Sequence, residues 1–230
     1  MNSKLIHSMF YDVFFPDTSK NNEEASQLCL QKILRFRPNE KQSMSNADIV
    51  VFDFETTGLD TTLDRIIEIG AIKYRNHQEI DSWTQLINPG MNLTETAANI
   101  TGISNEMLAD QPFISEVLDD FLQFIEGSIL CAHNAEFDMA FLKSACQKAG
   151  YQLVWPCFCT LRMARVLIPE LPSKNLDTLA KHFELTFDAR HRSMGDCRVT
   201  GSVLYEMTKT HSQSLKKWGD FDPYTVGKIS

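Results

Sequence analysis

The alternation of hydrophobic and polar positions predicts strands in the first half of the chain and helices later. Apolar residues run together or alternate over residues 49–55, 65–74 and 80–87, and turn residues end two of these runs, as is typical of β-strands. The short connections between them predict an antiparallel meander, and 128–132 predicts a further strand. Apolar positions at helical spacing predict helices over residues 94–100, 113–125, 134–148, 160–167, 176–182 and 193–209.

This order of elements predicts an α/β domain over residues 47–209, with a mixed sheet flanked by helices. Residues 1–46 are expected to form an extension, with one amphipathic helix between Glu23 and Phe36 and a polar linker. The extension either packs on the main domain or serves as an arm that docks a partner. Residues 210–230 form a polar tail with three aromatic residues that we expect to pack back on the domain: Trp218, Phe221 and Tyr224.

The composition excludes several classes of protein. Hydrophobic residues make up 43% and charged residues 23%, which suits a globular chain and excludes wholesale disorder. No run approaches the ~20 apolar residues of a membrane span, and residues 1–15 lack the apolar core of a secretion signal, so we expect a cytoplasmic protein. The six cysteines form no C-x-x-C pair, which argues against structural zinc. A net charge of −8 argues against a broad basic surface for nucleic acid, but not against a metal-dependent nucleic-acid enzyme with a local cleft.

Two carboxylates interrupt the first apolar strand. Asp53 and Glu55 are two residues apart, so both side chains lie on the same face, opposite Phe52 and Phe54. Ionised groups on a buried face are costly unless they are compensated, and hard oxygen donors suit Mg²⁺ or Mn²⁺. The pair therefore predicts either a metal site or a strand end at which both acids are solvated.

Three further residues carry candidate chemistry. Asp138 falls in the first turn of a helix for which Asn134 is a good cap, and alone it is explained by the helix dipole. Asp196 either completes a capping box with Ser193 or, since it shares a stripe with core residues, faces the interior as a metal ligand. His191 precedes it by five residues, and alone it is an ordinary loop histidine.

Taken together, these residues form an ordered pattern. Three motifs follow one another along the chain: Asp-x-Glu in a strand, Asn-x-x-Phe-Asp at the start of a helix and His-x-x-x-x-Asp at the start of a later helix. Three stretches match further motifs: Phe52–Leu59, Arg65–Ala71 and Ile100–Ile103. The chain thus resembles the DEDDh family of 3′-to-5′ exonucleases, which is DnaQ-like and includes the proofreading epsilon subunit of bacterial DNA polymerase III, RNase T and oligoribonuclease. It departs from the family at Asn99, where many members carry His. The resemblance covers about residues 48–209.

The resemblance implies an RNase H-like fold with a five-stranded mixed sheet in which the strand 49–55 is central. It also implies that two divalent cations, Mg²⁺ or Mn²⁺, are held by four carboxylates and that His191 is the general base. The four implied ligands are Asp53, Glu55, Asp138 and Asp196. The loop of Thr56, Thr57, Gly58 and Leu59 would contact the terminal nucleotide, although Gly58 alone is equally explained by the conformation of the turn.

The function expected from the resemblance is hydrolysis of DNA or RNA from the 3′ end to nucleoside 5′-monophosphates, with single-stranded ends as substrate. A DNA polymerase is a partner by analogy with the epsilon subunit. Two alternatives remain: a noncatalytic docking module with the same fold, and another two-metal phosphodiesterase. Other residues have plainer explanations, with Asn134 as a helix cap and His133 as structural. Glu68 is either an acid that supports the metal ligands or, as we expect, a solvated edge acid, while Arg190 and Arg192 either meet phosphate or lie in a solvated turn.

Overall fold

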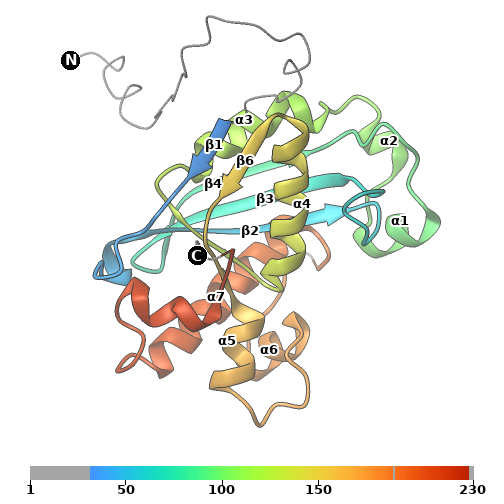
Figure 1. Ribbon diagram of the computed structural model, residues 1–230. Coiled ribbons are helices and arrows are strands. Elements are labelled where there is room, and N and C mark those ends of the chain that lie inside the picture. The colour runs from blue at the N-terminus through green and yellow to red at the C-terminus, as the bar shows by residue number, and fades with distance from the viewer. Residues whose placement is uncertain (1–31, 189, 228–230) are drawn as a thin grey trace, which may run out of the picture. The chain divides into compact units, whose positions relative to one another are not determined.

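A mixed sheet, with strand order β4-β3-β2-β5-β7-β8, organises the computed structural model, which describes residues 32–188 and 190–227 (Figure 1). The strands β2, β3 and β4 form the predicted antiparallel meander, and β2, β5 and β7 run parallel. Strand β8 closes the far edge antiparallel to β7. The strands are β2 (Asp48–Thr56), β3 (Ile66–Arg75), β4 (Gln78–Leu86), β5 (Ile129–Ala132), β7 (Cys157–Cys159) and β8 (Thr225–Val226).

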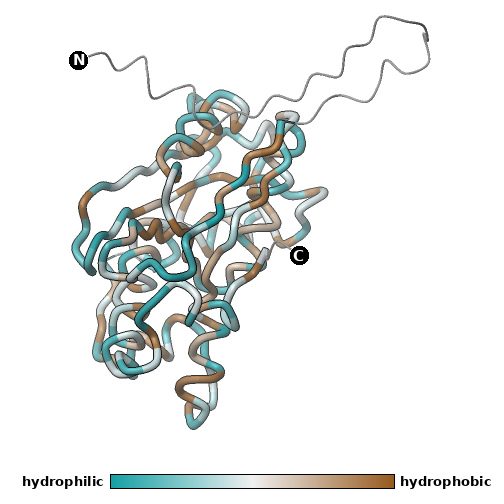
Figure 2. The backbone as a smooth tube through the Cα atoms, turned by 60° about the vertical axis from the view of Figure 1, so that its left-hand side comes forward, coloured by the Kyte–Doolittle hydropathy of each residue, from teal (hydrophilic) through white to brown (hydrophobic). Residues whose placement is uncertain are grey.

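Helices cover both faces of this sheet. The alternation in β2 turns Phe52 and Phe54 toward one core with α3 and α4, and it turns Ile49 and Val51 toward a second core with α5, α6, α7 and the 3-10 helix η2. Figure 2 shows hydrophobic stretches of the chain, in brown, among the segments in the middle of the domain. The helices are α1 (Glu95–Thr101), α2 (Asn105–Leu108), α3 (Ile114–Ile125), α4 (Ala135–Lys148), α5 (Thr160–Leu167), α6 (Leu176–His182) and α7 (Ser193–Thr210), with 3-10 helices η1 (Met44–Asn46) and η2 (Trp218–Tyr224).

The predicted fold class is confirmed, with one correction to the sheet. The described sheet has six strands instead of five, because β8 in the tail pairs with β7 after η2. Trp218 and Phe221 stack on Phe158 of β7, with ring centroids 4.5 Å apart in both pairs, and Tyr224 is also buried. The aromatic residues of the tail therefore pack back on the domain as predicted.

The helix predicted between Glu23 and Phe36 is wrong for its described part. Residues Lys32–Arg35 form strand β1, which pairs in parallel with β6 (Tyr151–Val154) in a separate two-stranded sheet. Phe36 stacks on Trp155 at 5.0 Å, and its N–H donates to the carbonyl of Val154. A backbone partner far along the sequence thus overrides a helical apolar spacing, while residues 23–31 lie outside the described residues. The domain limits at residues 46 and 209 stay predictions.

Candidate active site

The site lies where the parallel strands β2 and β5 end, the edge of an α/β sheet at which ligands commonly bind. Asp53 and Glu55 stand on the face of β2 that is turned toward α7, and both are half-buried. In the register with β3, Asp53 is opposite Gly70 and Glu55 is opposite Glu68. The sequence prediction that both carboxylates share one face of an apolar strand therefore agrees with the register of β2.

Asp138 reaches the same place from the other side of β2. Strand β5 ends at Ala132, and α4 begins at Ala135 after Asn134, whose backbone is left-handed with φ 59°. Asp138 in the first turn is buried, and its Oδ1 accepts a hydrogen bond of 3.1 Å from the N–H of Phe54. Asn134 is the N-cap residue of α4 as predicted, but its side chain makes no capping hydrogen bond. Asn134 instead lines the pocket beside the carboxylates.

Asp196 comes from the first turn of α7, which packs very closely on β3. A Cβ atom on Gly70 would lie 2.6 Å from Ser193 Oγ and 2.7 Å from the Ser193 carbonyl carbon, so only glycine allows this approach. Ser193 is buried in the first turn of α7 and Arg192 is the N-cap residue, which excludes the alternative of a capping box between Ser193 and Asp196. Asp196 is 5% exposed, and its carboxylate faces the sheet.

Three of these carboxylates converge tightly. One carboxylate oxygen each from Asp53, Glu55 and Asp196 lies within 4.8 Å of the other two, and Asp138 adjoins them through Phe54. Asp196 Oδ1 is buried and has no hydrogen-bond partner among the described residues. Three converging carboxylates are hard oxygen ligands that suit a divalent cation such as Mg²⁺ or Mn²⁺. A cation bound here would also give the buried Asp196 Oδ1 the partner that it lacks.

The raised pKa values of the four carboxylates also favour a bound cation. Burial, followed by the charges of Asp138 and Glu55, raises the pKa of Asp53 well above its usual range. Burial also raises the pKa of Glu55 to about 7, that of Asp196 to about 6 and that of Asp138 to about 8, although Arg190 opposes the shift at Asp196 and the Phe54 N–H opposes it at Asp138. Carboxylates gathered in a partly desolvated place favour either protons or a metal cation.

His191 and Arg190 form the turn that leads into α7. His191 is half-exposed and has a positive φ of 57°, an uncommon conformation for a residue other than glycine. Its Nδ1 lies 3.3 Å from Nη1 of Arg190. Burial and the charge of Arg190 lower the pKa of His191, which favours the neutral imidazole at neutral pH.

Two charged residues near the site have a different role from the one expected. Glu68 is 3% exposed, so the prediction of a solvated edge acid is wrong. Its carboxylate accepts hydrogen bonds from Arg192, at 2.6 Å from Nη2, and from the Ser193 N–H at 2.9 Å. Glu68 thus fixes the N-terminus of α7 on β3. The signal in the sequence was an acid inside an apolar strand, but its arginine partner lies 124 residues away.

The loop after β2 presents an apolar side chain to solvent. Thr57 is buried and donates to Asp64 Oδ1 at 2.8 Å, while Thr56 Oγ1 donates to the Gly58 carbonyl at 2.6 Å. A Cβ atom on Gly58 would lie 2.5 Å from Asp64, so contact with the loop explains this glycine. Leu59 is 83% exposed. The loop is therefore held by its own hydrogen bonds, with Leu59 free to contact a ligand.

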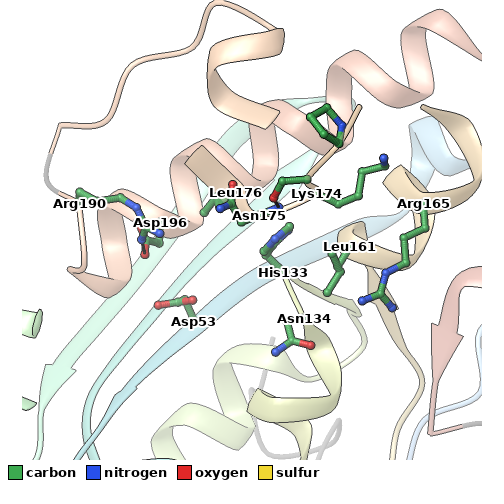
Figure 3. A pocket seen from close by; sticks show the side chains of 12 residues that line it. Asp53, His133, Asn134, Leu161, Arg165, Lys174, Asn175, Leu176, Arg190 and Asp196 are labelled. Carbon is green, nitrogen blue, oxygen red and sulfur yellow. Dashed lines mark hydrogen bonds and ion pairs between the residues drawn. The ribbon is translucent and has the colours of Figure 1, made fainter. Parts of the chain in front are cut away.

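A pocket of about 840 Å³ opens beside the carboxylates (Figure 3). Arg190, Asp196 and Asp53 lie together on one side, and Arg165 and Lys174 lie on the other. His133 stands between the two sides, with its Nδ1 2.9 Å from Thr160 Oγ1, and burial lowers its pKa to about 4. This hydrogen bond agrees with the structural role predicted for His133. The pocket joins an acidic end to a basic end, which suits an anionic ligand held partly through metal.

The fold and this cluster define the class of protein as a nuclease with an RNase H-like fold. The exonuclease family model matches residues 50–204, and the chain belongs to this exonuclease family of phosphodiester hydrolases. The match confirms the resemblance to DnaQ-like exonucleases. In addition, the structure contains no helix among the described residues that is long and apolar enough to span a membrane.

Individual proteins are similar to this chain in sequence or share its fold. The chain is 39% identical over 168 residues to a PolC-type DNA polymerase III of Caldanaerobacter subterraneus subsp. tengcongensis, covering 73% of this chain but only 12% of that relative. Exonuclease X, solved with 5′ overhanging duplex DNA, shares the fold with a TM-score of 0.59 at 24% identity, over 75% of this chain and 98% of that one. A zinc-bound E. coli exonuclease I with single-stranded DNA matches with a TM-score of 0.64 at 19% identity, over 74% and 42%.

Proposed function

We propose that this chain is a metal-dependent 3′-to-5′ exonuclease that hydrolyses the terminal phosphodiester bond of a DNA strand and releases nucleoside 5′-monophosphates. The observation that carries the proposal is the convergence of Asp53, Glu55 and Asp196 within 4.8 Å, with a buried Asp196 oxygen that lacks a partner. The membership of the chain in the exonuclease family supports it.

Four carboxylates are available to hold the metal. Asp53 and Glu55 come from β2, Asp196 from α7 and Asp138 from α4, so three elements fix the site rigidly. Two divalent cations bound here, Mg²⁺ or Mn²⁺, would supply Lewis-acid stabilisation of the attacking and leaving oxygens. The scaffold contributes by excluding water from one side of the cluster, since Asp138 and Asp196 are both buried.

His191 is the proposed general base. It is half-exposed on the turn that leads into α7 and Asp196, and its lowered pKa favours the neutral ring at neutral pH. A neutral imidazole has one nitrogen lone pair, and this lone pair would take the proton from the attacking water. The role is set by the position of the turn, which Glu68 and Arg192 hold against β3.

The loop of Thr56, Thr57, Gly58 and Leu59 is proposed to receive the terminal nucleotide. The buried hydroxyl of Thr57 and the tight contact at Gly58 hold the loop close to the end of β2. Leu59, which is almost fully exposed, offers an apolar surface on which a base can stack.

Single-stranded DNA 3′ ends are the proposed substrate, and a DNA polymerase is the proposed partner. The similarity to the PolC-type polymerase and the fold shared with exonuclease I, solved with single-stranded DNA, support this choice. A net charge of −8 favours short contacts at a strand end over tracking along a duplex. A cytoplasmic location belongs to the same proposal, because the relative that this chain resembles is a DNA polymerase.

The test is digestion of a single-stranded DNA oligonucleotide labelled at its 5′ end, with EDTA-treated protein reloaded with Mg²⁺ or Mn²⁺. We expect a descending ladder of labelled products, and no products in EDTA. Asp53→Asn should reduce the rate by more than about 100-fold, because the loss of even a supporting group around a metal site costs about 10–100-fold. Asp81→Asn, which changes an exposed acid at the edge of the sheet, serves as the matched control.

Two results would contradict the proposal. Immediate release of the labelled terminal nucleotide would show the opposite polarity, and cleavage of a circular single strand would show an endonuclease. A matched RNA oligonucleotide in the same assay measures the preference between DNA and RNA, which depends on contacts to the 2′-hydroxyl.

A further inference from the structure

Arg190 is held between acids from two different helices. Its Nε donates to Asp177 Oδ1 at 2.7 Å and its Nη2 donates to Asp177 Oδ2 at 3.2 Å, which is the fork geometry of a bidentate pair with the first turn of α6. The guanidinium also lies over the Phe187 ring, 5.1 Å from its centroid. Two of its nitrogens are thus anchored outside the carboxylate cluster, which leaves Nη1 directed inward.

Nη1 of Arg190 contacts two side chains that the proposed reaction needs, Asp196 and His191. It donates to Oδ2 of Asp196, and it lies 3.3 Å from Nδ1 of His191. Arginine only donates hydrogen bonds, so Nδ1 is the acceptor and the proton of the neutral ring sits on Nε2. The lone pair of His191 therefore faces the guanidinium, and one Asp196 oxygen is taken while the other is buried without a partner.

The charge of Arg190 also compensates the cluster. The guanidinium lines the same pocket as Asp53 and Asp196, and its charge lowers the pKa of both acids against the effect of their burial. Arg192, the other arginine of this turn, is bound instead to Glu68 at 2.6 Å. Arg190 is therefore placed to act on the same oxygens as a divalent cation.

We infer that Arg190 is an internal counter-ion that holds Asp196 and His191 in the metal-free protein and competes with divalent metal for Asp196. This inference rests on the proposed metal site. When metal takes Asp196, Nη1 loses that acceptor and the guanidinium stays anchored on Asp177. Arg190 is thus a positioning residue that holds the Asp196 carboxylate and the His191 ring before metal binds.

The inference predicts opposite effects on metal affinity and on stability. Arg190→Met removes the charge but keeps an unbranched side chain, so Mn²⁺ should bind roughly tenfold tighter, the scale of one charge contact at about 5 Å in a solvated site. The metal-free protein should melt at a lower temperature, because the cluster loses its compensating charge. Arg190→Lys keeps the charge but loses the fork, so it should lower the melting temperature and leave Mn²⁺ affinity within about threefold of wild type.

The measurement is Mn²⁺ titration followed by electron paramagnetic resonance at low salt, with melting curves in EDTA. Arg198→Met is the matched control, because Arg198 lies on α7 and its side chain pairs with Glu79 and Asp188 outside the cluster. A merely structural arginine would disorder the turn on removal and weaken Mn²⁺ binding, so weaker or unchanged binding in Arg190→Met overturns the inference. Arg190→Gln, with the same expected tightening, decides the question if the methionine variant does not fold. Absence of Mn²⁺ binding in wild type would instead overturn the proposed metal site itself.

Discussion

His191 illustrates how much depends on a single residue in this site. Its backbone has a φ of 57°, and its ring is held at 3.3 Å from Arg190 on the turn that leads to Asp196. A residue other than glycine in this region costs of order 1 kcal/mol or more and persists where the surroundings impose it. The hydrogen bonds of Arg190 and Arg192 on either side supply that constraint. The position of His191 is therefore set by its neighbours and not by its own preference.

We expect His191→Ala to slow the chemical step by roughly 10²–10⁴-fold, the usual contribution of a general base. Metal affinity should change little, because carboxylates supply the proposed ligands. Single-turnover cleavage at saturating metal and substrate measures the chemical step, and His182→Ala, an exposed histidine on α6, is the control. A rate within about threefold of wild type would remove His191 from the mechanism.

At the scale of elements, the contact between α7 and β3 decides whether the site exists. Gly70 lets the helix approach until its Ser193 meets the strand, and Glu68 binds the Ser193 N–H at 2.9 Å. Cys197 Sγ contacts the Gly70 carbonyl at 3.3 Å one turn further on. Together these contacts bring Asp196 to the carboxylates of β2, which belong to the neighbouring strand.

Gly70→Ala tests this contact. The added methyl group would meet Ser193 backbone at 2.7 Å, so α7 must shift, at a cost of about 1–3 kcal/mol in the free energy of unfolding. Because the shift moves Asp196, Mn²⁺ affinity should fall together with stability. Gly201→Ala is the control, because Gly201 lies on the same helix, away from the cluster. Its added methyl group would meet the Tyr74 ring of β3 at 2.8 Å. If Gly70→Ala bound Mn²⁺ as tightly as Gly201→Ala, the approach of α7 would not set the site.

For the whole molecule, the carboxylate cluster makes stability depend on pH and metal. The folded-state pKa values of Glu55, about 7, and of Asp138, about 8, are raised above their unfolded values near 4. Between these values the folded state holds protons that the unfolded state has released, so the free energy of unfolding falls as pH rises. Bound metal replaces the protons as the compensating charge and removes this penalty.

We therefore expect the metal-free protein to lose thermal stability steadily between about pH 5 and pH 8. Added Mg²⁺ or Mn²⁺ should raise the melting temperature most at the upper end of this range, because the carboxylates are then ionised. Differential scanning calorimetry across this range, with EDTA or with metal, measures both effects. If the melting temperature of the metal-free wild type rose from pH 5 to pH 8, and that of metal-free Asp53→Asn rose in the same way, the shifted pKa values of the cluster would be contradicted.

The sequence by itself determined the class of fold and the order of its long elements. The strand predicted at 49–55 and the helices predicted at 134–148 and 193–209 begin and end within about one residue of the predicted bounds, because the spacing of apolar residues is a local feature of the chain. The sequence motifs also singled out the carboxylates that the structure brings together, since Asp53 and Glu55 interrupt an otherwise apolar strand. These features are local in the chain, which explains why they are readable without the structure.

The tertiary structure decided the features that depend on partners far apart in the sequence. β1 forms a strand because β6 offers it hydrogen bonds, and β8 extends the sheet because Trp218 and Phe221 stack on Phe158. The burial of Glu68 follows from Arg192, 124 residues away, and the placement of Arg190 follows from Asp177 and Asp196 on separate helices. No local pattern encodes such pairs, because their favourable interaction exists only after the fold has brought both members into contact.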